Sequence, residues 1–149
     1  MAEAVNPTEA ASPTKPSPDP SRPRLNLDDS KQLALLAAEA CDDRKAGDIV
    51  LLRVEEISSI ADWFVIATGF SDVQVRAIAR SVEDKLEIEL GRLPLRREGQ
   101  SEGRWVLLDY GEVIVHVLTP SEREYYDLES FWGHGEQVRY LGSSPATNA

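Results

Sequence analysis

The chain has 149 residues and carries 16 basic against 26 acidic side chains, so its net charge is −10 at neutral pH. This length suits one domain, because domains typically hold about 100–200 residues. A single cysteine excludes an intrachain disulfide and a four-cysteine zinc site. No apolar run approaches the ~18 residues that span a bilayer, and the acidity argues against broad phosphate neutralisation. The composition therefore predicts a small soluble domain from a reducing compartment.

The composition changes near residue 25. Six of the nine prolines lie in the first 24 residues, where large apolar side chains are almost absent. Such a segment cannot bury enough surface to offset its chain entropy, so residues 1–24 are predicted to be a disordered, Pro-rich tail. Residues 25–141 form the predicted domain, and residues 142–149 a flexible C-terminus. Glu3 and Glu9 disfavour a mitochondrial transit peptide, which leaves organelle import as the minor alternative for the tail.

The first half of the domain predicts one helix and two strands. Apolar residues at helical spacing indicate a helix over residues 28–44, capped by Asp28, Asp29 or Ser30. Gly47 is placed to end that helix in a left-handed conformation. Strands are predicted over residues 48–54 and 63–68. The second of these is continuously apolar, as in a strand buried on both faces.

The second half begins with a capping pair, Ser71 and Gln74, which predicts a helix that Gly91 closes. A loop over residues 98–103 joins two strands. Further strands at residues 105–109 and 112–118 flank a tight turn at Tyr110 and Gly111. A last short helix is expected from Thr119, with a threonine cap and Pro120 in its first turn, as far as Trp132.

This order predicts an α/β fold with a mixed five-stranded sheet and helices on both faces. The arrangement resembles that of nucleotidyltransferases, which hold two magnesium ions on carboxylates placed one residue apart on a strand. No Asp-x-Asp or Glu-x-Asp pair lies on a predicted strand here. We therefore expect a nucleotidyltransferase-like topology that lacks the catalytic carboxylates.

Other candidate chemistry is weak. Cys41 is expected to be a buried structural thiol, and His116 a partly buried, hydrogen-bonded histidine. His134 could pair with His116 on a metal, but no ligand spacing supports a metal site or a cofactor. The turn over residues 68–71 follows a strand and opens a helix, where a phosphate could bind. It contains one glycine and no lysine, so helix capping is the stronger interpretation of Ser71.

Two clusters suggest contact with a macromolecule. Arg92, Arg96 and Arg97 form a small basic group, interpreted as a solvated face, with local contact to RNA as the alternative. Six of the ten aromatic residues lie between positions 105 and 132, more than a core strand pair needs. Tyr110 is expected to be exposed, because turn residues seldom reach the core.

Three stretches, at residues 61–71, 103–117 and 123–132, resemble the ribosomal silencing factor family, also called Iojap-like proteins. The resemblance implies a cytoplasmic, non-enzymatic protein that binds the fourteenth large-subunit ribosomal protein on the face that meets the small subunit. It would thereby block subunit joining and repress translation when nutrients are short. Carried over by motif, the binding residues are Trp105, Asp109, Tyr110, Gly111 and Val113.

Some alternatives stay open beside this interpretation. An exposed apolar patch can also pair with a second copy, so a homodimer is an alternative state of the free protein. A small nucleotide-binding or transferase enzyme is the second hypothesis, and it requires residues 68–71 to bind phosphate. Residues 31–149 hold 13 of the basic and 21 of the acidic residues, so the acidity belongs to the predicted domain. That charge favours a basic ribosomal protein over bare RNA as the contact.

Overall fold

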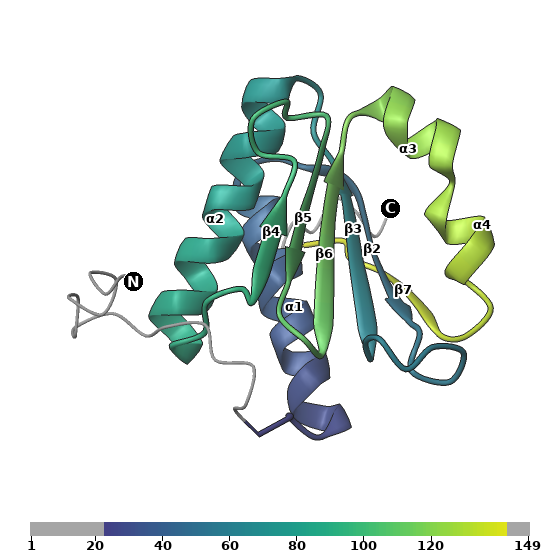
Figure 1. The fold of residues 1–149 in the computed structure, drawn as a ribbon. Helices are drawn as coiled ribbons and strands as arrows, with labels where there is room; N and C mark the ends of the chain where they lie inside the picture. The colour runs from purple at the N-terminus through teal and green to yellow at the C-terminus, as the bar shows by residue number, and fades with distance from the viewer. Residues whose placement is uncertain (1–22, 143–149) are drawn as a thin grey trace, which may run out of the picture.

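The fold is built on a mixed sheet whose strands lie in the order β4-β5-β6-β3-β2-β7 (Figure 1). The computed structural model describes residues 23–142, so almost all of the predicted tail and all but one residue of the predicted C-terminal segment lie outside the described residues. The elements are α1 (Leu27–Asp43), β2 (Gly47–Arg53), β3 (Trp63–Thr68), α2 (Asp72–Leu90), β4 (Arg96–Glu98), β5 (Trp105–Asp109), β6 (Val113–Leu118), α3 (Pro120–Tyr126), α4 (Leu128–Trp132) and β7 (Gln137–Arg139).

The α/β class and the helices on both faces are confirmed, but the sheet has six strands and not five. The additional strand, β7, spans three residues and pairs antiparallel with β2, with Val138 opposite Leu51. Val138 is its single apolar residue, so hydrophobic alternation could not identify it. Its pairing with β2 comes from the tertiary fold.

The central pair of strands, β3 and β6, is parallel, with Phe64 opposite Ile114 and Ile66 opposite His116. The other strand pairs are antiparallel. Every residue of β3 and of β6 is buried, which confirms the prediction that residues 63–68 are covered on both faces. The parallel pairing requires a long crossover between the two strands, and α2, β4 and β5 supply it.

Each face of the sheet has its own core. On one face α1 and α2 bury a large cluster that includes Leu33, Ile78 and Val115. On the other face Leu128 and Trp132 of α4 pack against a smaller cluster that includes Leu52 and Phe64. Figure 1 shows α1 and α2 on one side of the sheet and α4 on the other. No helix among the described residues is long and apolar enough to cross a bilayer.

The ends of the first helix differ from the prediction. Asn26 caps α1, because its Oδ1 accepts a hydrogen bond from the Asp29 N–H at 2.8 Å. Lys45, and not Gly47, adopts the left-handed conformation after the helix, with φ of 63°. Gly47 instead begins β2, where a Cβ would lie 2.7 Å from the Phe70 ring. Phe70 is 63% exposed, so its ring can move to admit a side chain, and this contact alone does not require a glycine.

The later caps are mostly as predicted. The Ser71 hydroxyl accepts from the Gln74 N–H at 3.0 Å, and Gly91 ends α2 with φ of 65°. The Gln74 amide also donates to the Arg44 and Lys45 carbonyls, which ties the start of α2 to the end of α1. The last helix is divided into α3 and α4 by Asp127, whose φ is 47°. The Thr119 hydroxyl makes no capping bond.

Candidate functional site

One face of β5 is only partly covered. Val106 and Leu108 point into the core beneath α1 and α2, so Trp105, Leu107 and Asp109 point to the opposite face. These three side chains remain partly exposed, and the neighbouring β4 is exposed throughout. Leu107 was not among the predicted binding residues, although its position between Trp105 and Asp109 in a period of two places it on their face.

A hollow of about 350 Å³ lies on this face, lined by Glu98, Gly99, Trp105 and Leu107. Gly99 allows the loop after β4 to approach β5 closely. Its φ is 89°, and a Cβ at this position would overlap the Trp105 carbonyl oxygen. The loop therefore forms one wall of a shallow recess in which the indole of Trp105 forms another.

Aromatic side chains of α3 extend this surface. The Trp105 and Tyr126 rings lie 4.8 Å apart between centroids, and the Tyr125 and Tyr126 rings lie 4.9 Å apart. Tyr125 is 79% exposed and Tyr126 is 48% exposed. Trp105, Leu107, Tyr125 and Tyr126 together are called the aromatic surface below. The prediction that several aromatics of this region face solvent is confirmed for α3, and also for Phe131 of α4.

The hairpin turn contradicts the prediction for Tyr110, which is fully buried. Side chains at positions 106, 108 and 110 share one face, so the alternation of β5 continues through the turn and carries the phenol ring into the core beneath α2. Val113 is also buried. Gly111 is partly exposed, has φ of 92°, and donates to the Asp109 carboxylate at 2.8 Å.

The five residues taken from the resemblance thus occupy different places. Trp105 and Asp109 share a face but stand at opposite ends of β5, roughly 13 Å apart at ~3.3 Å per residue. Tyr110 and Val113 lie in the core on the other face. Trp105 and Asp109, with Gly111 at the turn, are the ones a partner can touch directly. Tyr110 and Val113 support the hairpin from inside.

A buried ion pair supports the turn from below. The Glu112 carboxylate accepts from Arg92 at 2.6 Å and from the Leu25 N–H at 2.9 Å. Burial alone would raise the pKa of Glu112, but these hydrogen bonds and the guanidinium charge hold it below its ordinary value. Arg92 also donates to the Tyr110 carbonyl. The side chain of Arg92 is only 12% exposed, so its interpretation as part of a solvated face is wrong.

The other two arginines of the basic group are on β4 and more exposed. Arg96 lies 3.4 Å from Asp109 and 3.5 Å from Glu98, while Arg97 makes a two-pronged contact with Glu83. Each of these charges is therefore already compensated within the chain.

The predicted roles of the cysteine and the central histidine are confirmed. Cys41 is buried, and burial, with the nearby Asp42 and Asp43, raises the pKa of its thiol to about 12. His116 is 5% exposed, and its Nδ1 accepts a hydrogen bond from Trp105 Nε1 at 3.2 Å. Burial lowers the pKa of His116 to about 4, so the ring is neutral at physiological pH.

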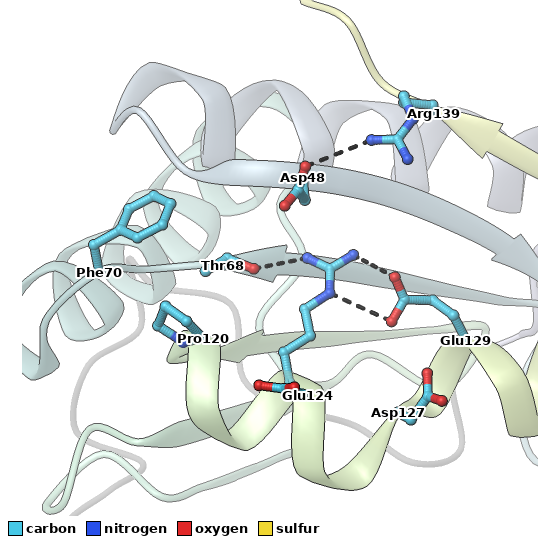
Figure 2. A pocket seen from close by; sticks show the side chains of 9 residues that line it. Asp48, Thr68, Phe70, Pro120, Glu124, Asp127, Glu129 and Arg139 are labelled. Atoms are coloured by element: carbon cyan, nitrogen blue, oxygen red, sulfur yellow. Dashed lines mark hydrogen bonds and ion pairs between the residues drawn. The ribbon is translucent and has the colours of Figure 1, made fainter.

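A second hollow, of about 390 Å³, lies where β3 ends (Figure 2). Arg123 is one of its lining residues, and the guanidinium donates to the Thr68 hydroxyl at 2.8 Å and to both oxygens of Glu129 at 2.6 and 3.3 Å. Asp48 and Arg139 also line the hollow and pair at 3.6 Å. The lining contains four carboxylates, from Asp48, Glu124, Asp127 and Glu129, against two guanidinium groups. A phosphate would therefore meet a net negative lining.

No group of three or more metal-ligating side chains is arranged to hold an ion within residues 23–142. His134 is exposed near the C-terminus, and the structure gives it no ion pair or hydrogen bond with His116. The two histidines lie on different elements, β6 and the loop before β7.

Comparison with known proteins places the chain in a family. A family model described as "Ribosomal silencing factor during starvation" matches residues 27–148. The chain belongs to this family. It is 50% identical to the ribosomal silencing factor RsfS of Bacillus subtilis over 103 residues, which are 69% of this chain and 86% of the relative. It is 44% identical to that of Halalkalibacterium halodurans over 113 residues, 76% of this chain and 96% of the relative.

A solved structure agrees with the fold. A crystal structure of a protein from Chromobacterium violaceum is 37% identical and superposes with a TM-score of 0.66. The alignment covers 81% of this chain and 98% of that protein. Family membership confirms the resemblance read from the three sequence stretches, and it assigns the chain to regulation of translation at the ribosome.

Proposed function

We propose that this protein binds the fourteenth large-subunit ribosomal protein on the intersubunit face, through the aromatic surface and the outward edge of the β5–β6 hairpin. Bound there, it blocks joining of the ribosomal subunits and represses translation under nutrient limitation, in the cytoplasm and without catalysis. The observation that carries the proposal is the partly exposed indole of Trp105, which forms one wall of the 350 Å³ hollow beside Leu107.

The chemistry of this surface suits a protein partner. Buried tryptophan and tyrosine side chains are enriched among the residues that dominate binding energy at interfaces. Here the tryptophan stands beside a recess that a partner side chain can fill, and Tyr125 and Tyr126 enlarge the apolar area around it. The net charge of −10 favours a basic protein surface and disfavours bare RNA.

The proposal includes two further contacts, one with ribosomal RNA and one with a second copy of the chain. Arg96 lies at the exposed edge strand and can make a minor contact with ribosomal RNA at the rim, once it leaves Glu98 and Asp109. The aromatic surface can also pair with a second copy of the chain when no ribosome is present. A homodimer formed in this way would have to dissociate before the large subunit is bound.

The proposal is tested by sedimentation of purified large subunits with the protein and its Trp105→Ala variant. Truncation of a hot-spot tryptophan costs at least ~2 kcal/mol, so we expect roughly 30-fold weaker binding or more. Ile88→Ala is the matched control, because Ile88 is 79% exposed on α2, on the other face of the sheet. A subunit-joining assay by light scattering should show inhibition by the parent and by the control variant, but not by Trp105→Ala.

If the Trp105→Ala variant bound large subunits as tightly as the parent, and circular dichroism showed an intact fold, the aromatic surface would not be part of the interface.

The nucleotide-binding alternative has its own test, calorimetry with nucleotides and magnesium. The charge of Arg123 is already compensated by Glu129, and the lining of that hollow is acidic. We therefore expect no heat at micromolar ligand, and a clear signal would revive the alternative.

A further inference from the structure

The indole of Trp105 is held on two sides. Its Nε1–H donates to Nδ1 of His116 at 3.2 Å, and its ring packs against Tyr126 with centroids 4.8 Å apart. Trp105 pairs with Leu118 across the β5–β6 ladder, so His116 is its diagonal neighbour on the same face. The contact therefore joins a partly exposed side chain to a buried one.

His116 itself has little freedom to move. It lies in β6, whose residues are all buried between β5 and β3. Phe64 of β3 packs against the imidazole with ring centroids 4.8 Å apart, on the opposite side from Trp105. A rotation of the imidazole would have to displace this ring or open the sheet.

The hydrogen bond also fixes the tautomer of His116. Nδ1 accepts the indole proton, so the ring's own proton is on Nε2. Nε2 is buried and has no hydrogen-bond partner among the described residues. A buried donor without a partner is costly, and a leucine or phenylalanine at this position would avoid that cost. The bond to Trp105 is the polar contact that the imidazole makes within residues 23–142.

We propose that His116 is a positioning residue for partner binding: its Nδ1 holds the Trp105 indole in the orientation that the partner receives. This inference rests on the proposed function, because it requires Trp105 to touch the partner. Its physical basis is preorganisation. A side chain already fixed in the free protein loses less conformational freedom on binding, which corresponds to roughly 2- to 10-fold in affinity for one large side chain.

Two substitutions separate the hydrogen bond from packing. His116→Leu keeps apolar volume and removes the acceptor. His116→Asn retains an acceptor, because the Asn Oδ1 is attached to Cγ as the imidazole Nδ1 is. We expect roughly 5-fold weaker binding to large subunits for the leucine variant and near-parental binding for the asparagine variant. Both are first checked for folding by circular dichroism.

Nuclear magnetic resonance observes the indole N–H of Trp105 directly, so its signal reports on the hydrogen bond and not on overall stability. The chain has three tryptophans and therefore three indole N–H resonances, of which Trp105→Phe removes and so assigns one. In His116→Leu that resonance should shift upfield, as an indole proton does when its acceptor is lost, and in His116→Asn it should return. An unchanged resonance in His116→Leu would overturn the inference.

A double-mutant cycle decides whether His116 acts through Trp105. In the Trp105→Phe background, His116→Leu should weaken binding no further, because the donor is already gone. An equal loss in both backgrounds would mean that His116 acts by another route, and the inference would fall while the proposed function stood. If Trp105→Phe itself bound like the parent, the indole hydrogen bond would not matter for binding and the inference would fall, while the proposed interface would still be judged by Trp105→Ala.

Discussion

Acidification should destabilise this fold through His116, before the carboxylates titrate. The ordinary pKa of histidine is 6.5, and burial lowers that of His116 to about 4 in the folded protein. Between these values the unfolded chain binds a proton that the folded chain excludes, so the free energy of unfolding falls as the pH falls. At 1.36 kcal/mol per unit, the full displacement corresponds to about 3 kcal/mol, a large part of the 5–15 kcal/mol typical of a domain.

Glu112 sets the lower pH limit of this measurement. Glu112 has a pKa below its ordinary value of 4.5, so it contributes stability that is present above pH 4.5 and is lost only at lower pH. Urea denaturation between about pH 7.5 and 4.5 therefore reports mainly on His116. The parent should lose most of the 3 kcal/mol across that range. His116→Asn, which retains the acceptor and cannot titrate, should lose much less. His134 is present in both proteins, so it does not contribute to the difference between them.

The test compares how steeply the free energy of unfolding falls with pH in the two proteins. It therefore holds even if the asparagine variant starts from a lower stability. If the two proteins lost stability in parallel, the imidazole would not be neutral and desolvated in the folded state. The tautomer assigned to it would then lose its basis. A steeper loss in the asparagine variant would contradict the reasoning in the same way.

Three further outcomes are expected. Tyr110→Ala should lower the free energy of unfolding by about 3–5 kcal/mol in urea titrations, as for other buried aromatic truncations, so it cannot serve as an interface probe. Arg92→Met leaves the buried Glu112 carboxylate without its cation and should cost about 3–5 kcal/mol, whereas Arg97→Met, which breaks an exposed pair, should cost under ~1 kcal/mol. Binding to large subunits should weaken as salt concentration rises, and unchanged or stronger binding would exclude attraction between opposite charges.

Regular elements with a strong pattern were predictable from the sequence. The continuous apolar run at residues 63–68 indicated a strand buried on both faces, and it became the centre of the sheet. Ser71 and Gly91 marked the two ends of α2 correctly, because each satisfies backbone groups that a helix leaves unpaired. These are local signals, and the tertiary fold does not override them.

The errors have identifiable physical causes. β7 has one apolar side chain, and its pairing with β2 depends on a chain reversal that no local pattern encodes. Lys45 adopts a left-handed conformation that a glycine was expected to take, because the two carbonyls before Ala46 are held by the Gln74 amide, 29 and 30 residues away. Both features are set by contacts distant in sequence.

Part of the candidate site could have been derived from the alternation of β5 alone. Positions 106, 108 and 110 form one face and positions 105, 107 and 109 the other, which assigns Tyr110 to the core and Leu107 to the surface. Placing Tyr110 at the tip of a turn obscured this, since the turn was assumed to end the alternation. The bond between Trp105 and His116 could not be derived, because it depends on the register between β5 and β6.

The topology explains why the surface proposed as the interface is uncovered on β5. In open α/β sheets, ligands usually bind beyond the carboxyl ends of parallel strands, where the connections leave toward opposite faces. That place exists here, where α2 follows β3 on one face and α3 follows β6 on the other, but the Arg123 guanidinium stands in it, bound to Thr68 and Glu129. After β6 the chain continues through α3 and α4 towards β7, at the far edge of the sheet, and α4 packs over β2 and β3 (Figure 1). The same course leaves β4 and most of the outer face of β5 uncovered, because α3 reaches β5 only at Trp105, through Tyr126. The exposed indole is therefore a consequence of where the last third of the chain runs.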